Sequence, residues 1–223
     1  VSTTLVPGRK LTAPRLDVTA TRAGLQINGK GLIGVVPFDA SYSQGFGAAD
    51  KGLAQIAGTI SLSQQAAEDF GLGLPEGMVS GKGVAQVTID LRRGQAGKLS
   101  LRSDLAGIGL SIDGLGWSKP AAATGSLSAE VTLATLPKVD SLRLAAAGLT
   151  AQGSVTLREG GGLDLARFDR VQLLEWLDAP VEFRGRGRAR APALAVTGGR
   201  VDLRAMPPAS QRGAGRQLGD GPV

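Results

Sequence analysis

KLSLRS at 98–103 and GSLSAEVTL at 125–133 place an aliphatic residue at every second position and a polar residue between. GIGLSID at 107–113 and GSVTLR at 153–158 repeat this alternation. A period of two is typical of half-buried β-strands, because successive side chains point to opposite faces of a sheet. Glycine turns separate such stretches from about residue 79 to residue 203. The sequence therefore predicts an all-β fold whose sheet has one continuous apolar face.

Length and composition agree with one folded β unit. The chain has 223 residues, of which 42% are hydrophobic and only 4% aromatic, so its apolar surface is mainly Leu, Val, Ile and Ala. A chain of this length can bury a core, and by length alone it could be one large β domain or two small ones. We expect residues 1–205 to form the β unit. The tail at 206–223 is rich in Gly and Pro without periodicity, and is predicted to be disordered or a linker.

Local signals predict how the strands are interrupted. Asn28–Gly29 is a strong hairpin-turn dipeptide between apolar stretches. SQQAAEDFG at 63–71 begins with a capping Ser and continues with good helix formers, which predicts one short helix. Trp117 and Trp176 both lie near prolines, and we expect each to pack over the end of the sheet.

The residue types needed for most catalysis are missing. The chain has no His and no Cys, which excludes histidine-based triads, imidazole or thiolate metal sites and disulfides. Gly160–Gly162 lacks the Lys-Ser/Thr of a phosphate-binding loop and is predicted to be a hairpin turn, and Ser118–Lys119 lacks the spacing of a catalytic dyad. We expect no catalytic residues, no metal and no cofactor, and therefore no enzyme.

Carboxylate pairs remain as general acid–base candidates. They are Glu68 with Asp69, and Asp164 and Asp169 with Glu175 and Asp178, the second set interleaved with Arg158, Arg167 and Arg170. Ion pairing across strands is the simpler interpretation of that second set, and solvation that of the first. A β-helical carbohydrate-active enzyme would also need rows of aromatic residues, which this chain does not supply.

The net charge of +6 favours anionic partners such as phospholipid headgroups. One tyrosine and few aromatic residues argue against nucleic acid. The segment FRGRGRAR at 183–190 is the most distinctive charged feature, and in a strand its arginines would share one face over ~20 Å. The candidate headgroup residues are Arg184, Arg186, Arg188 and Arg190. A solvated outer face matched by acids on neighbouring strands is the alternative.

The aliphatic faces have two interpretations as well. They form either a groove for lipid acyl chains or the closed core of a β-sandwich, and alternation alone cannot separate the two. On composition alone the sandwich is favoured. The candidate groove residues are Leu99, Leu101, Ile108, Leu110, Ile112, Leu127, Val131, Leu133, Leu142, Leu144, Val155 and Leu157.

Three longer segments carry a family resemblance. They are AGIGLSIDGLGWSKPAAATG (106–125), LRLAAAGLTAQGSVTL (142–157) and RFDRVQLLEWLDAPVEFRGRGR (167–188). They resemble the AsmA-like superfamily of Gram-negative bacteria, in particular its YhdP branch, with TamB as a more distant relative. The similarity spans roughly 55–205, and LGWSKP and LDAP are its most specific parts.

The resemblance implies a long periplasmic protein attached to the inner membrane by an anchor outside this chain. Its strands would form an elongated, twisted antiparallel sheet with a half-open apolar groove that passes phospholipid towards the outer membrane. It supplies no catalytic residues. It favours the open groove over the sandwich. The alternative is a non-catalytic periplasmic module whose free sheet edge binds an outer-membrane assembly partner by strand addition.

Overall fold

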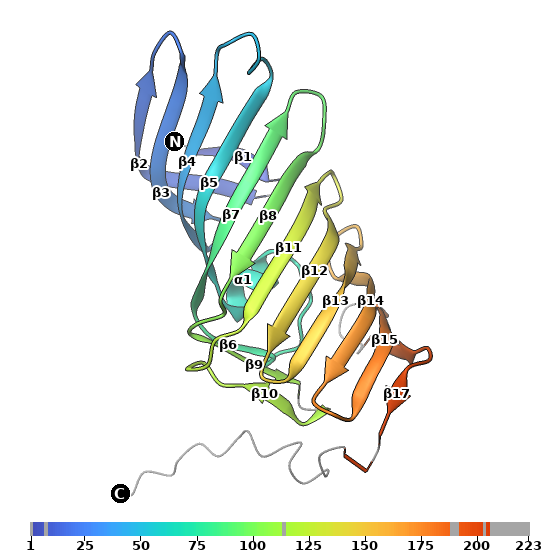
Figure 1. Cartoon of the computed structure of the whole chain (residues 1–223). Coiled ribbons are helices and arrows are strands. Elements are labelled where there is room, and N and C mark those ends of the chain that lie inside the picture. The colour runs from blue at the N-terminus through green and yellow to red at the C-terminus, as the bar shows by residue number, and fades with distance from the viewer. Residues whose placement is uncertain (1, 7–8, 113–114, 188–191, 203, 206–223) are drawn as a thin grey trace, which may run out of the picture.

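The computed structural model describes residues 2–6, 9–112, 115–187, 192–202 and 204–205. These residues are mostly β-strand and include one short helix. Figure 1 shows long strands side by side, stepping from the N-terminal end of the sheet to the C-terminal end with a pronounced twist. The predicted fold class, an elongated antiparallel sheet with one short helix, is confirmed.

Among the described residues, fourteen strands form the main sheet, and all their pairings are antiparallel. Its first half comprises β1 (Ser2–Val6), β2 (Arg9–Ala20), β3 (Gly24–Ile33), β4 (Val36–Gly45), β5 (Leu53–Leu62), β7 (Gly83–Arg92) and β8 (Gly97–Ser103). Its second half comprises β11 (Ser126–Leu133), β12 (Lys138–Ala146), β13 (Leu149–Leu157), β14 (Leu163–Leu173), β15 (Leu177–Arg184), β16 (Ala193–Val196) and β17 (Arg200–Val201). Neighbours in the sheet follow chain order except for β17, which pairs with β15, and the sheet is not closed into a barrel.

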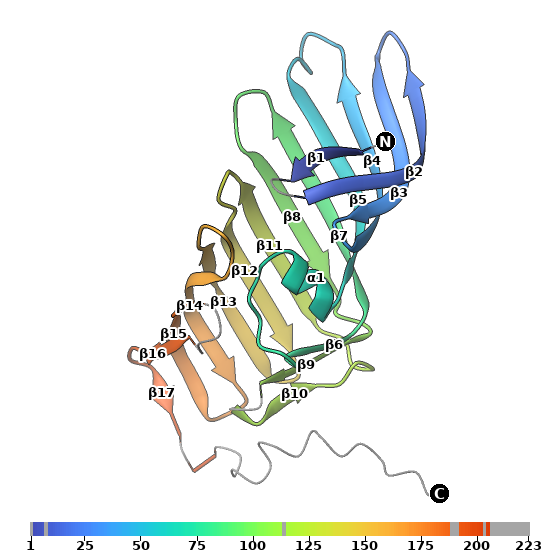
Figure 2. The ribbon, with the colours of Figure 1, turned by 180° about the vertical axis from the view of Figure 1, so that it is seen from behind.

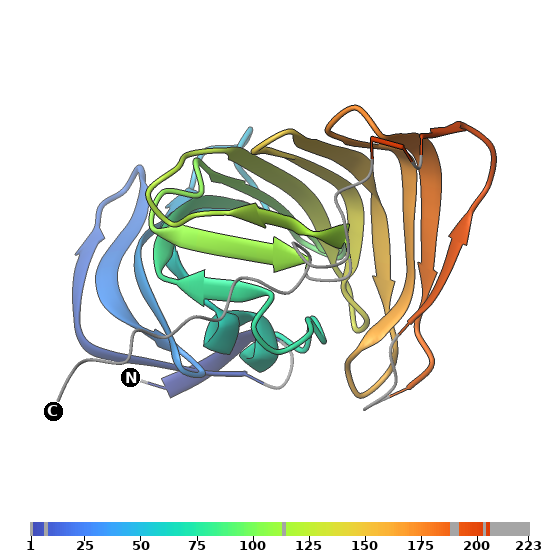
Figure 3. The ribbon, with the colours of Figure 1, turned by 90° about the horizontal axis from the view of Figure 1, so that it is seen from below.

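Two connections leave the main sheet and meet each other. The β5–β7 connection carries α1 (Gln64–Asp69) and β6 (Val79–Gly81), and the β8–β11 connection carries β9 (Ile108–Ile112) and β10 (Trp117–Lys119). These three short strands form a second sheet in the order β10-β9-β6. Figures 2 and 3 show this sheet and α1 on the concave side of the main sheet. We call this concave side the inner face and the convex side the outer face.

The predicted helix forms where expected and is capped as expected. The Ser63 hydroxyl accepts a hydrogen bond from the Ala66 N–H at 3.1 Å, which satisfies one of the unpaired amides of the first turn. Ala66 and Ala67 are buried and form the apolar side of α1. The helix therefore packs against the sheet through small side chains.

The hairpin turn predicted at Asn28–Gly29 is wrong. Both residues lie within β3, where Gly29 pairs with Leu16 of β2 and with Ala40 of β4. The chain turns instead at Gly34, which has a φ of +60°. A Cβ on Gly29 would overlap the side chain of Leu16, so this glycine accommodates a neighbouring side chain rather than a turn.

A compact core closes one end of the inner face. It contains Trp117 from the small sheet together with Trp176, Leu173 and Leu177 from the β14–β15 end of the main sheet. Both tryptophans therefore pack at the end of the sheet, as predicted. Leu110 and Ile112 of β9 pack against this core, so the small sheet covers the inner face at this end. We call this small sheet, β6, β9 and β10, the cover.

Candidate functional site

The inner face carries two apolar rows that cross twelve strands of the main sheet. The first row consists of residues that are directly opposite one another on successive strands. Its members are Val18, Ile27, Tyr42, Ile56, Ile89, Leu99, Val131, Val139, Val155, Ala166, Phe183 and Leu194. No charged residue interrupts it. Because strands lie ~4.8 Å apart, the row is about 50 Å long.

The second row runs beside the first and contains smaller residues. Its members are Leu16, Gly29, Ala40, Gly58, Val87, Leu101, Ala129, Leu142, Gly153, Phe168, Val181 and Val196. Two aligned rows arise because the pairing registers bring the apolar face of each strand to the same side. β12 and β14 contain bulges, and each bulge leaves the two rows aligned.

The inner face is neither a closed core nor fully exposed. In the first row every residue from Ile27 to Val155 is half-buried. The rows end in solvent at both edges, because Val18 is 60% exposed, Leu194 55% and Val196 43%. A sandwich core would bury these side chains under a second sheet along their whole length. Here the small sheet covers one end of the inner face, and α1 with the chain after it lies over its middle, whereas both edges stay exposed, so the groove is half-open.

Nine of the twelve groove residues predicted from the sequence lie on the inner face of the main sheet, and all nine are half-buried. They are Leu99, Leu101, Leu127, Val131, Leu133, Leu142, Leu144, Val155 and Leu157. The other three belong to β9 of the small sheet. Ile108 is only 2% exposed and is a core residue, and Leu110 and Ile112 pack on the core cluster. These three residues therefore form part of the cover.

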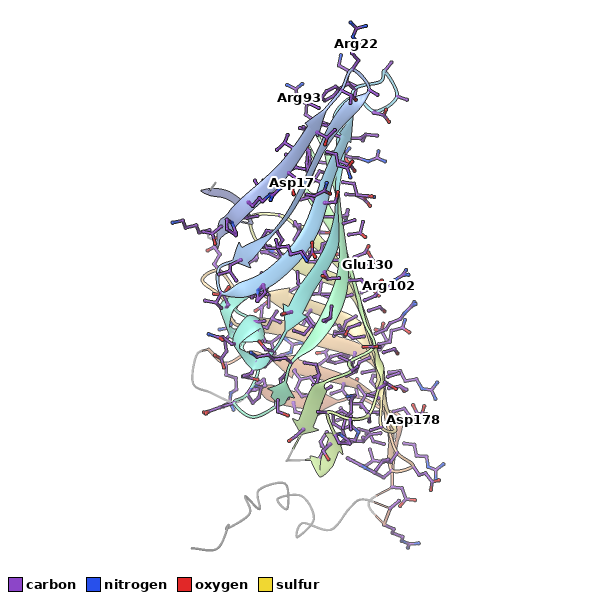
Figure 4. The ribbon with its side chains drawn as sticks, turned by 90° about the vertical axis from the view of Figure 1, so that its left-hand side faces the viewer. Asp17, Arg22, Arg93, Arg102, Glu130 and Asp178 are labelled. Atoms are coloured by element: carbon purple, nitrogen blue, oxygen red, sulfur yellow. The ribbon has the colours of Figure 1, made fainter. Side chains whose placement is uncertain are left out.

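The outer face is polar, and its charges are largely paired. Figure 4 shows Arg102, Glu130 and Asp178 projecting from this convex side. Arg170 binds Asp178 at 2.6 Å, and Arg167 binds Glu182 at 2.8 Å. The hydrogen bond from Arg170 lowers the pKa of Asp178, and that from Arg167 lowers the pKa of Glu182.

Asp178 is one of two members of the four-residue carboxylate set at 164–178 that form ion pairs, as predicted for that set, and Asp164 is the other. Arg158 lies 3.6 Å from Asp164, which adds a third pair between β14 and its neighbours. The Ser118–Lys119 pair has no dyad geometry. The Lys119 ammonium donates to the carbonyl oxygens of Leu105, Ile108 and Pro120 at 2.9, 2.6 and 3.2 Å. All three of its protons are committed to the backbone.

Lys119 is a structural residue that our sequence analysis did not identify. It is 1% exposed and connects β10 to the chain between β8 and β9. Trp117 also fixes the cover, since its indole N–H donates to the Ala147 carbonyl at 2.9 Å. The two residues are two positions apart in one strand and therefore share a face. In a strand formed by LGWSKP, a buried Trp117 places Lys119 on the same, buried face, and this spacing is the signal in the sequence.

The strand predicted for the arginine ladder is shorter than expected. β15 ends at Arg184, and Gly187 has a φ of +94°, outside the β region. Arg186 therefore does not continue the ladder, and Arg188 and Arg190 lie outside the described residues. Arg184 itself is 3.2 Å from Glu182, which already pairs with Arg167. Of the four predicted headgroup residues, Arg184 has a defined place, and it is on the outer face.

Comparison of the chain with models of known protein families, with curated proteins and with solved structures finds no match. None of the helices in the described part of the chain has the length and apolar character to cross a membrane. Within the same residues, no three acidic side chains gather as a metal site would require. The twelve-strand apolar surface is therefore the feature on which a functional proposal rests.

Proposed function

We propose that the inner face holds lipid acyl chains, and that the chain is a segment of a periplasmic protein that passes phospholipid between the inner and outer membranes. The single observation that supports this most is the pair of apolar rows that cross twelve strands. They are about 50 Å long, whereas one leaflet of a ~30 Å bilayer core spans only ~15 Å. Acyl chains of that length fit lengthwise along the rows.

The driving force in this proposal is hydrophobic burial. Each CH₂ group moved out of water contributes ~0.8 kcal/mol, and the half-buried side chains of the rows gain cover at the same time. The inner face is mainly aliphatic and carries few polar groups. The Tyr42 hydroxyl, for example, is already bonded to Gln44 at 2.8 Å. Because the two rows offer an acyl chain no fixed polar partner, a bound acyl chain slides along them without breaking specific hydrogen bonds.

The polar outer face has a complementary role in this proposal. It faces water while the inner face carries the lipid, and lipid headgroups stay outside the groove. The location in the periplasm and the inner-membrane anchor are proposed from the resemblance of 106–125, 142–157 and 167–188 to AsmA-like proteins. The chain itself is proposed to contribute no catalytic step.

A photo-crosslinking experiment tests where lipid lies. A benzophenone amino acid replaces Leu142, which is on the inner face, or Arg143, the next residue on the outer face of the same strand. The proposal predicts phospholipid adducts, identified by mass spectrometry, at 142 and not at 143. Equal labelling at the two positions, or none at either, would contradict it.

A second candidate function is a non-catalytic module that binds an outer-membrane assembly partner. The observation that favours it is β16, whose four residues are all exposed at the edge of the main sheet. Such an edge can accept an added strand. Protection of the β16 amides from hydrogen exchange by a partner peptide, in protein that carries no lipid, would favour this candidate.

A further inference from the structure

The connection between α1 and β6, residues 70–78, reaches across the inner face, and we call it the strap. It leaves β5 through α1, and its glycines meet the β13–β14 hairpin. The Gly162 N–H donates to the Gly71 carbonyl at 3.0 Å. Four strands of the main sheet, β7, β8, β11 and β12, lie between β5 and β13. The chain from Leu62 to Gly71, which is α1 and the start of the strap, therefore bridges a section of sheet about five strand spacings, or ~24 Å, wide.

The pairing register shows that the strap crosses both apolar rows. On β5 the chain passes the first row at Ile56 and the second at Gly58, and it leaves the sheet beyond the second row at Leu62. On β13 the chain passes the second row first, at Gly153, and then the first row, at Val155. Leu157 and the β13–β14 hairpin therefore lie beyond the first row. A strap joining these two ends must pass over both rows. In Figure 3, α1 and the chain after it lie across the open side of the curved sheet.

The contact between strap and hairpin is made by glycine on both sides. A Cβ on Gly71 would lie 3.6 Å from the Gly161 Cα, and a Cβ on Gly73 would lie 3.4 Å from the Gly162 Cα. The two backbones thus pack closely without side chains. Such a contact buries little apolar area, whereas the two ends of the strap are held by α1 and by the small sheet. Gly71 directly follows α1, and its N–H donates to the Glu68 carbonyl at 2.9 Å, so the contact joins the end of α1 to the hairpin through a single backbone hydrogen bond.

We propose that the strap is a lateral gate over the inner face. This inference rests on the proposed lipid-binding function. With the Gly71–Gly162 bond formed, the strap and the sheet from β5 to β13 make a closed ring around the acyl chains. Lipid then moves along the rows and cannot leave sideways. When the bond opens, the ring opens, and lipid enters or leaves through the side of the groove.

A disulfide tests the gate because the chain has no native cysteine. In Gly71→Cys/Gly161→Cys, each Cβ lies close to the other residue's Cα, at 3.6 and 3.9 Å, which brings the two thiols within reach of a crosslink. The protein is loaded with a fluorescent phospholipid in the reduced state and then oxidised. Transfer to acceptor vesicles is followed with and without reductant. The gate predicts transfer about tenfold slower or more in the oxidised protein, with full recovery on reduction.

The controls separate the gate from other effects. Gly71 and Gly161 both have positive φ, so cysteine strains the backbone there, and the two single-cysteine variants measure that strain alone. A short bismaleimide joins the cysteines of the double variant if the disulfide does not form. Equal transfer rates for crosslinked and uncrosslinked protein would overturn the gate while leaving lipid binding intact. Failure of the wild-type protein to take up lipid would instead overturn the proposed function.

Discussion

Replacing Lys119 by Met removes the ammonium that holds the cover and keeps a side chain of similar length. The lysine makes three hydrogen bonds to backbone carbonyls, each worth about 1.5–3 kcal/mol because the donor is charged. Part of this is offset, because burying an ammonium costs several kcal/mol. Two of the three carbonyls also keep another donor, since Leu105 accepts from the Ile108 N–H and Pro120 from the Ala123 N–H. The net expectation is a loss of about 2–4 kcal/mol in the free energy of unfolding.

Urea unfolding followed by tryptophan fluorescence measures this loss directly. Trp117 and Trp176 are both in the core cluster beside the cover, so their emission reports on this end of the molecule. For a chain of this size the loss corresponds to a melting temperature lower by about 5–15 °C. Lys51→Met, at an exposed lysine, is the matched control and should change little. A Lys119→Met protein as stable as the wild type would refute the assignment of Lys119 as the residue that holds the cover.

Three further predictions concern the groove, the cover and the ion pairs. Ala129→Glu puts a carboxylate on the second row and should displace about four CH₂ groups of a bound acyl chain, the number that fits in one ~4.8 Å strand spacing. The lipid affinity should then fall by ~3 kcal/mol, or about 100-fold, in a fluorescent-lipid titration. Ser128→Glu, on the outer face of the same strand, should leave that affinity unchanged, and equal losses for both would count against the groove. Trp117→Phe removes the bond to Ala147 and also the pyrrole part of a buried indole, and should lower the free energy of unfolding by about 2 kcal/mol or more in urea; no change would show that Trp117 does not fix the cover. Asp178 and Glu182 have lowered pKa values, so their contribution to stability is present above pH 4.5 and is lost as the pH falls through their folded-state pKa values. The urea midpoint of Asp178→Asn should therefore fall less on acidification than that of the wild type, and an equal fall would contradict this.

The sheet and most of the groove could be predicted from the sequence because strand alternation is a local signal. Leu99, Val131 and Val155 alternate with polar residues, and such strands cannot shift by one residue without turning their apolar side chains to the other face. The glycine turn at 160–162 and the helix cap at Ser63 form as predicted, because each depends only on residues close to it in the chain.

The errors arose where long-range pairing overrides a local signal. Asn28–Gly29 has the composition of a turn, but β2 and β4 pair with β3 on both sides and hold it extended. Ile108 alternates as the groove residues do, and nothing local tells which of two sheets a strand joins. Arg186 lies between the end of β15 at Arg184 and Gly187, whose φ of +94° is outside the β region, so the extended ladder stops before it.

The most direct test of a lipid-filled inner face is the lipid content of the protein itself. The full chain is purified without detergent and examined by native mass spectrometry, with bound species released and identified. Phospholipid bound to the wild-type protein, and lost from Ala129→Glu but not from Ser128→Glu, is the expected result. A folded wild-type protein free of lipid would contradict the proposal that this face carries acyl chains.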